Sequence, residues 1–358
     1  FLTPGNFANL LTQAASVTVI AMGLVFVLLL GEIDLSAGYA SGVCGAVLVI
    51  LITNHGYPWW IALIISIICG AILGYVIGSL VSRLGIPSFV VTLAAFLMFQ
   101  GLLLLLAGEG GTIRIEDPTI LAVQNNNLTP TLSWILFLAV SVFYVLVGLA
   151  RINSRRKAGL KSELKKLWII KTISLLALGA GAVYALNLER SNNPDLVSLK
   201  GTPFIVPVIL VLLVGGTFVL GRTAYGRHIY AVGGNAEAAR RSGINVKNIR
   251  TSAFVICSSF AAIAGMLFAS RQNSISPTTG GSSTLLYAVG AAVIGGTSLF
   301  GGKGKMRDAV LGGLVVAVID NGMGLLGYAA GVKFIVTGAV LLISAGVDAI
   351  SRRGAASN

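Results

Sequence analysis

The sequence is made of long apolar segments separated by shorter polar ones. Eleven segments, each roughly 17–25 residues long, contain almost no charge, and this is the length that an α-helix needs to cross a bilayer. They lie at about 7–30, 37–53, 59–81, 88–107, 132–150, 168–188, 204–220, 251–270, 284–300, 308–327 and 332–350. The segment at 284–300 is rich in glycine, so it either crosses or enters the membrane and returns. The pattern predicts an all-α polytopic membrane protein, with one transmembrane domain over 1–358.

Composition and charge support this class and add a topology. With 56% hydrophobic and only 10% charged residues, the chain is not an ordinary soluble domain. Its net charge of +13 would suit nucleic acid, but 19 of the 25 Lys and Arg residues fall in five segments that alternating spans place on one side. Those segments are 82–87, 151–167, 221–250, 301–307 and 351–358. Lys and Arg mark cytoplasmic loops, so we expect a basic cytoplasmic loop at 151–167, a long one at 221–250 and no nucleic-acid partner.

The beginning of the chain predicts a segment before it. An odd number of spans puts Phe1 outside and the C-terminus inside. The chain starts with Phe instead of Met and has neither a charged leader nor a cleavage site. We therefore expect a preceding N-terminal span that is missing from this sequence.

The residues that commonly make catalytic or metal sites are few. Three cysteines, Cys44, Cys69 and Cys257, fall inside apolar segments without paired spacing, which is typical of small core residues. Two histidines, His55 and His228, both lie in loops and cannot build a metal site or a catalytic triad. We expect no enzyme activity, no metal site and no cofactor bound by this chain.

Glycine, with 45 residues, is the second strong feature of the composition. Glycines recur every four residues from Gly70 to Gly78, which predicts close packing against a neighbouring helix. A second glycine-rich segment, 295–304, resembles a phosphate-binding loop but has Thr297 and Gly304 where that motif needs Gly and Ser or Thr. If ATP drives this protein, another chain binds and hydrolyses it with Mg²⁺.

Acidic residues in or near the apolar segments are candidates for ion coupling, because carriers that use ion gradients need carboxylates within the membrane. Glu32 and Asp34 lie between the first two segments, and Asp320 and its neighbour Asn321 lie near the end of the tenth. None of them pairs in sequence with a basic residue in a relay. An ion-coupled secondary sugar transporter therefore stays as the alternative function, and capping of the next helix by Asp34 or Ser36 stays as an alternative role.

Four residues of the fourth segment form a possible substrate-contacting stripe. Phe89, Thr92, Phe96 and Gln100 are three and four residues apart, so they share one helix face. Aromatic rings and an amide suit a sugar, which stacks its ring and hydrogen-bonds its hydroxyls. Core packing with one interhelical hydrogen bond is the competing interpretation.

The long polar segment at 221–250 contains a predicted short helix. Asn235 is a plausible N-cap, Glu237 follows in the first turn, and Gly243 is a typical helix end, which gives about seven helical residues. Small side chains on this helix would fit a groove on a partner, namely those of Ala236, Ala238, Ala239 and Ser242. The alternative is a solvated basic loop.

Several motifs then identify a family resemblance. Glu237-Ala-Ala-Arg-Arg-Ser-Gly243 resembles the coupling-loop signature of ABC importer permeases, and Gly226–Val246 as a whole resembles the loop of the ribose/xylose/galactose permeases. Four more motifs agree in order, at Gly31–Gly38, Pro87–Leu93, Ile294–Gly304 and Asp320–Met323, so the resemblance covers about 5–350. Glu32, where ribose-type members usually have Gly, and the extra loop and span at 151–188 resemble the xylose branch.

The resemblance implies a fold, a mechanism and partners. The fold would be a multi-helix permease of the cobalamin-importer type, with broken or re-entrant segments, in the bacterial cytoplasmic membrane and its lipid. A second copy of the chain, two copies of a cytoplasmic sugar ATPase that carries ATP and Mg²⁺, and an extracytoplasmic sugar-binding protein would complete an importer that works by alternating access. The expected ATPase contacts are Gly234, Asn235, Glu237, Ala238, Ala239, Ser242 and Gly243. The expected pathway residues are Phe89, Thr92, Phe96 and Gln100, while Glu32, Asp34, Asp320 and Asn321 belong to motifs of unassigned role.

One departure from the family pattern concerns the outer gate. Family members often have an acidic pair before Ile-Gly-Gly-Thr-Ser, where this chain has Leu285 and Tyr287. Any acidic role there is lost or moved. The resemblance implies a monosaccharide, a pentose such as xylose, as the substrate of this permease.

Overall fold

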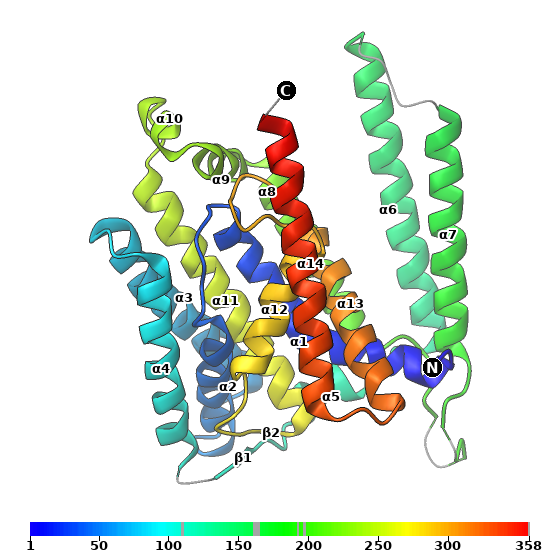
Figure 1. Cartoon of the computed structure of the whole chain (residues 1–358). Helices are drawn as coiled ribbons and strands as arrows, with labels where there is room; N and C mark the ends of the chain where they lie inside the picture. Colours follow the sequence, from blue (N-terminus) through cyan, green and yellow to red (C-terminus); the bar gives the residue numbers. More distant parts are fainter. Residues whose placement is uncertain (109–110, 160–164, 192, 196–197, 357–358) are drawn as a thin grey trace. The chain divides into compact units, whose positions relative to one another are not determined.

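The computed structural model is almost entirely helical and describes residues 1–108, 111–159, 165–191, 193–195 and 198–356 (Figure 1). The chain divides into two compact units, which are described separately. One unit, the larger, consists of residues 10–125 and 208–358, and the other consists of residues 1–9 and 126–207.

The larger unit contains most of the helices and one small sheet. Its elements, with the two helices α1 and α8 that begin in the other unit's residues, are α1 (Pro4–Leu28), α2 (Ala37–Thr53), α3 (Trp59–Arg83), α4 (Ser88–Ala107), β1 (Ile113–Arg114), α5 (Pro118–Asn125), α8 (Ile205–Arg222), α9 (Ala224–Gly234), α10 (Ala236–Arg241), α11 (Val246–Gln272), β2 (Ser274–Ile275), α12 (Ser282–Ile294), α13 (Met306–Leu325) and α14 (Ala330–Ala356). β1 and β2 pair antiparallel, with Ile113 opposite Ile275.

The smaller unit is a pair of antiparallel helices, α6 (Pro130–Lys157) and α7 (Lys165–Asn187) (Figure 1). The expected basic loop at 151–167 is shorter than predicted, because α6 continues to Lys157, and residues 160–164 of this loop lie outside the described residues. A carboxylate organises the turn after α7. Glu189 accepts hydrogen bonds from the N–H groups of Ser191 and Leu199 and from the Ser198 hydroxyl, and these bonds lower the pKa of Glu189 to about 2.

The membrane-spanning character of the helices follows from their length and composition. Within the described residues, nine helices are long and apolar enough to cross a bilayer, and α2 and α12 are shorter apolar helices. Together they match the eleven predicted segments, so the prediction of an all-α polytopic protein is confirmed. α12 has 13 residues and ends at Ile294, so it is too short to cross about 30 Å of hydrocarbon alone. The chain turns at Gly295 and Gly296, and Gly296 has a φ of 119°.

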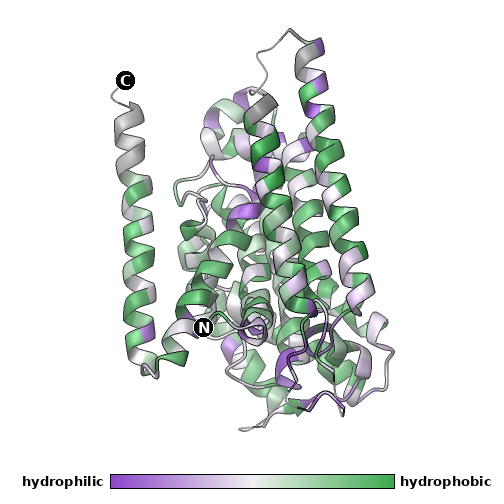
Figure 2. Ribbon diagram, turned by 90° about the vertical axis from the view of Figure 1, so that its right-hand side faces the viewer, coloured by the Kyte–Doolittle hydropathy of each residue, from purple (hydrophilic) through white to green (hydrophobic). Residues whose placement is uncertain are grey.

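The core of the larger unit is built around α1 and α2. Side chains from Val19 to Leu29 are buried on every face of α1, which explains why this helix is apolar all round instead of amphipathic. Figure 2 shows hydrophobic residues along whole helices and hydrophilic residues gathered at the loops. The C-terminal half of α1 is therefore shielded on all sides by protein.

Close helix packing at the glycines of α3 is confirmed. A Cβ atom at Gly70 would lie 2.5 Å from the Ser258 carbonyl oxygen of α11, and one at Gly74 would lie 2.4 Å from that of Phe254. Atoms this close cannot coexist, so only glycine lets the two backbones approach. Cys44, Cys69 and Cys257 form no disulfide. Within the described ranges, no group of three or more His, Cys, Asp or Glu side chains could hold a metal ion.

The larger unit has two distinct ends (Figure 1). The α3–α4 turn, α9, α10 and the loop between α12 and α13 lie at one end, and the β1–β2 sheet lies at the other. The first end contains segments 82–87, 221–250 and 301–307, which the charge distribution assigns to the cytoplasm. The opposite end is then extracytoplasmic.

Candidate functional site

The short helix α10 is capped at both ends. Asn235 is its N-cap, and the Asn235 Oδ1 atom accepts a hydrogen bond of 2.9 Å from the Ala238 N–H. At the other end, the N–H groups of Gly243 and Ile244 bond to the carbonyls of Arg240 and Ala239 at 3.0 and 3.1 Å, with Gly243 at a φ of 83°. This double closure at a left-handed glycine is a Schellman motif. The predicted helix from Asn235 to Gly243 is therefore confirmed.

One face of α10 is open and the other is buried. Ala239 is 4% exposed and packs within this chain, so it supports the helix from beneath. The exposed side chains are those of Glu237, Ala238, Arg240, Arg241 and Ser242. Glu237 pairs with Arg240 at 2.9 Å and with Arg241 at 3.2 Å, and these contacts lower the pKa of Glu237. The open face thus combines two small side chains with charges that are paired along the helix.

A second helix, α9, precedes α10 where the sequence predicted only a loop. The Thr223 side chain caps it by accepting from the Gly226 N–H at 3.1 Å. Ile229 and Val232 are buried, and the Tyr230 hydroxyl donates to the Gly304 carbonyl at 2.7 Å. Burial, and then the charge of Asp308, raise the pKa of Tyr230, so the hydroxyl remains a donor. The N-cap threonine with apolar residues three apart was the sequence signal for this helix.

The end of α9 meets two other segments at a place that we call the glycine junction, formed by Gly31, Gly233, Gly301 and Gly302. The Gly302 N–H donates to the Leu29 carbonyl at 2.8 Å. A Cβ atom at Gly233 would lie 1.8 Å from the Leu29 oxygen, and one at Gly301 would lie 2.9 Å from the Gly233 oxygen and from the Gly31 nitrogen. The end of α1, the end of α9 and the loop before α13 therefore touch backbone to backbone.

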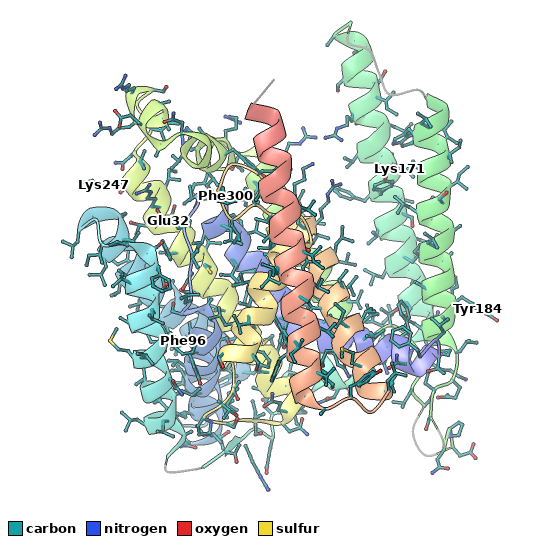
Figure 3. All side chains as sticks on the ribbon, viewed as in Figure 1. Glu32, Phe96, Lys171, Tyr184, Lys247 and Phe300 are labelled. Atoms are coloured by element: carbon teal, nitrogen blue, oxygen red, sulfur yellow. The ribbon has the colours of Figure 1, made fainter. Side chains whose placement is uncertain are left out.

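An ion pair joins the same region to α11. Glu32 Oε1 lies 3.3 Å from Arg250 Nε, and the two side chains are 14% and 32% exposed. Glu32 follows the glycine junction in sequence, and Arg250 is in the first turns of α11, just after α10. Figure 3 shows Glu32 and Phe300 near this end of the unit. Glu32, whose role the sequence left open, thus connects the α1–α2 loop to α11, the helix that follows α10.

Asp34 has a structural role. It is fully buried and accepts hydrogen bonds from the Ser36 N–H at 2.9 Å and the Ser36 hydroxyl at 2.6 Å. Ser36 stands at the N-cap position of α2, but its own side chain makes no capping bond. Of the two predicted caps, Asp34 therefore organises the start of α2.

The stripe on α4 does not form one continuous surface. Thr92 is buried and donates to the Ser88 carbonyl at 2.8 Å, and Phe96 packs edge-on against Tyr39 with 4.8 Å between ring centroids (Figure 3). Phe89 and Gln100 are exposed. The contacts of Thr92 and Phe96 fit the core-packing interpretation, and a pathway role for the stripe stays a prediction.

Asp320 and Asn321 lie in a cavity of about 370 Å³ at the end of the larger unit opposite α10. The cavity is lined by α1, α11, α12, α13 and α14. Asp320 Oδ1 lies 3.6 Å from Lys333 Nζ, and Asn321 Nδ2 donates to Gln13 Oε1 at 3.4 Å. Sequence reasoning found the two neighbours on α13 but missed Gln13 and Lys333. Gln13 is 308 residues away from Asn321 in the sequence, and Lys333 lies on the next helix, α14. No local sequence pattern reveals either contact.

Comparisons with known proteins agree with this architecture. A family model described as the permease component of branched-chain amino acid transport systems matches residues 6–345. The xylose transport system permease protein XylH of Escherichia coli K12 is 36% identical over 99% of this chain and 87% of its own. The protein of the same name from Haemophilus influenzae is 34% identical over 99% of this chain and 91% of its own. The D-allose permease protein AlsC of E. coli K12 is 28% identical over 97% of this chain and 84% of its own.

No solved structure matches the chain. The match to the family model nonetheless covers nearly the whole sequence, and the spans fit a multi-pass protein of the bacterial cytoplasmic membrane. This chain belongs to the family of permease components typified by the branched-chain amino acid transport systems.

Proposed function

We propose that this chain is the membrane-spanning permease subunit of an ATP-driven importer for a monosaccharide, and that the sugar is a pentose such as xylose. Two relatives above 30% identity along the whole chain are named as xylose permeases. The more distant relatives are named for ribose and D-allose, which are also monosaccharides. The class of substrate is therefore supported more broadly than the particular sugar.

The partners follow from this function. ATP would be hydrolysed, with Mg²⁺, by two copies of a separate cytoplasmic ATPase. A second copy of the permease would complete the transmembrane part in the lipid bilayer, and an extracytoplasmic binding protein would deliver the sugar. The permease itself then needs no cofactor.

The ATPase would dock on α10 and its two caps. The observation that supports this docking site is that hydrogen bonds cap α10 at both ends while the face with Ala238 and Ser242 is exposed to solvent. A helix fixed in this way transmits a push as a rigid body. The proposed contact residues are Gly234, Asn235, Glu237, Ala238, Ser242 and Gly243, with Ala239 beneath them.

The glycine junction would carry the movement into the membrane. α9 and α10 share Asn235, which ends one helix and caps the next, so the two helices move together. The junction couples α9 to the end of α1 and to the loop before α13, and the Glu32–Arg250 pair couples this region to α11. ATPase closure would thus bias three helices between two arrangements, as alternating access requires.

The test is sugar uptake by proteoliposomes that contain the assembled importer. Ala238→Trp places a large side chain on the open face of α10, and we expect it to abolish ATP-dependent xylose uptake because the ATPase no longer seats. Lys247→Trp is the matched control, since Lys247 is exposed just beyond α10 (Figure 3). Normal uptake by Ala238→Trp would refute docking at α10. Uptake driven by an ion gradient without ATP would instead support the secondary-transporter alternative.

A further inference from the structure

We infer that a pocket beside the β1–β2 sheet, at the extracytoplasmic end of the larger unit, binds the transported monosaccharide. We call it the sheet pocket, and the side chains that carry the argument are those of Thr112, Arg114, Glu116, Leu121, Gln272 and Ser274. Its volume of about 620 Å³ is within the range of ligand pockets, roughly 300–1,000 Å³. The inference rests on the proposed function and gives the sugar a first binding place on this chain.

The polar side chains of the sheet pocket share the outer face of the sheet. Thr112, Arg114 and Glu116 are exposed, whereas Ile115 between them is only 2% exposed. Successive side chains of an extended segment point to opposite faces, so the three polar side chains lie on one face. Ser274 is paired with Arg114 across the two strands and therefore lies on the same face.

Hydrogen bonds from neighbouring helices hold this face in place (Figure 1). The Thr53 hydroxyl, at the end of α2, donates to the Arg114 carbonyl at 3.1 Å, and Asn125 Nδ2, at the end of α5, donates to Asn273 Oδ1 at 3.2 Å. Asn273 is the C-cap of α11 and has a φ of 54°, so the chain turns sharply there and keeps Gln272 beside the sheet. A pocket with a fixed backbone loses little conformational entropy when a ligand binds.

The two charges in the sheet pocket balance. Arg114 and Glu116 supply one positive and one negative charge, and neither side chain forms a salt bridge with another residue of the described ranges. They are two residues apart in an extended segment, which separates them by about 7 Å along the chain. A small ion attracted by one of them is repelled by the other, whereas hydroxyl groups can accept from Arg114 and donate to Glu116. The lining therefore favours an uncharged ligand with several hydroxyls.

Uncharged side chains add to this hydrogen-bonding capacity. In the part of the chain that the structure describes, the Gln272 amide and the Thr112 hydroxyl have no hydrogen-bond partner. The amide supplies an acceptor and an NH₂ donor, and the hydroxyl both donates and accepts. Leu121, which is half-buried, provides an apolar wall for the C–H groups of a sugar ring. Free donors, free acceptors and one apolar wall match the surface of a monosaccharide.

The position of the sheet pocket suits the entry of a sugar that a binding protein releases on this side. The pocket is also connected to the docking end of the unit by α11, which contributes Gln272 to the pocket and Arg250 to the ion pair with Glu32. From Arg250 to Gln272 this helix rises by about 33 Å. One continuous helix therefore links the first sugar site to the region that the ATPase would move.

The first experiment measures binding without transport. Thr112→Cys places a thiol in the sheet pocket, and a membrane-impermeant maleimide added to right-side-out membrane vesicles of the importer should label it above the wild-type background. We expect D-xylose to slow this labelling, and sodium xylonate and glucosamine, which are charged, to leave it unchanged at equal concentration and ionic strength. No labelling, no protection by xylose, or equal protection by a charged sugar would overturn the inference.

The second experiment removes the proposed contacts in the Thr112→Cys background. Arg114→Met and Glu116→Leu should each raise the xylose concentration for half-maximal protection by about tenfold or more, because each loses a charge-assisted hydrogen bond. His55→Gln is the matched control, since His55 is exposed at the same end, just after α2, and lies outside the pocket. Unchanged protection in both pocket variants would overturn the inference while leaving the proposed function intact.

The third experiment separates the sugar from a protein occupant. In the complete importer, we expect Arg114→Met to lower ATP-dependent xylose uptake while the binding protein still stimulates ATP hydrolysis. Loss of this stimulation with unchanged xylose protection would make the face a docking surface for the binding protein and would overturn the inference. A wild-type importer that shows protection by xylose but no ATP-dependent uptake would refute the proposed function alone.

Discussion

Gly233→Ala is the sharpest test of the glycine junction, because it adds a single methyl group where three backbones meet. The new Cβ would lie 1.8 Å from the Leu29 oxygen, whereas real Cβ atoms stay at least 3.0 Å from such neighbours, so the two backbones must separate by about 1.2 Å. The Leu29 oxygen also accepts the 2.8 Å hydrogen bond from Gly302, which this movement would break or lengthen. No flexible side chain is present to give way.

The energetic consequence has two opposing parts. Overpacking a well-packed site costs about 1–3 kcal/mol, and a lost backbone hydrogen bond costs about 1 kcal/mol more. Alanine gains about 0.5–1 kcal/mol over glycine within a helix, which offsets only part of this cost. We therefore expect Gly233→Ala to be destabilised by about 1–3 kcal/mol.

Gly221→Ala is the matched control, since a Cβ at Gly221, inside α8, would meet nothing within 4 Å. The assay compares the apparent melting temperature of each purified variant in detergent, and ATP hydrolysis and sugar uptake by the reconstituted importer. We expect Gly233→Ala to melt earlier and to hydrolyse ATP with little uptake, while Gly221→Ala behaves as the wild type. If Gly233→Ala melts and transports like Gly221→Ala, the junction does not carry the movement.

Three further predictions concern single contacts. Glu32→Gln and Arg250→Met should be non-additive in unfolding free energy, with a coupling of about 0.5–3 kcal/mol in a double-mutant cycle, and additivity would show that the pair is not formed. Asn235→Ala should weaken α10 by about 1 kcal/mol and speed hydrogen exchange at the Ala238 amide, whereas Asn235→Asp should not, and equal exchange in both variants would contradict the capping role. The pKa of Glu189 is lowered to about 2, so its contribution to stability is present above about pH 4.5 and is lost as the pH falls towards 2. The melting temperatures of the wild type and Glu189→Gln should therefore differ near pH 6 and converge near pH 2. A difference that stays constant with pH would exclude this role.

The sequence was most informative where structure depends on neighbours in the chain. α10 was predicted with its caps, because Asn235 and Gly243 act on residues within one turn. The apolar helices were also predicted from local sequence, because a long hydrophobic segment is enough to specify each helix. α9 was missed because its sequence is polar and glycine-flanked, and its burial under other segments gives it stability that local propensity does not show.

Contacts between distant segments could not be predicted. The cavity brings together Gln13, Asp320 and Lys333 from three helices, and only the two neighbours on α13 formed a visible motif. The four predicted residues of α4 do not form one continuous surface, for a related reason. Helical spacing puts Phe89 and Gln100 on the face of Thr92, but neighbouring segments cover only the middle of that face.

The shortness of α12 has a consequence for permeability. Tyr287 lines the cavity, and from Tyr287 to the end of α12 at Ile294 the helix rises by only about 10 Å. The loop that contains Gly301 and Gly302 follows directly, at the cytoplasmic end of the unit. Along α12, only about two helical turns therefore separate the cavity from the loop at the cytoplasmic end. Access to the cavity from that end would require only a small displacement of this short segment.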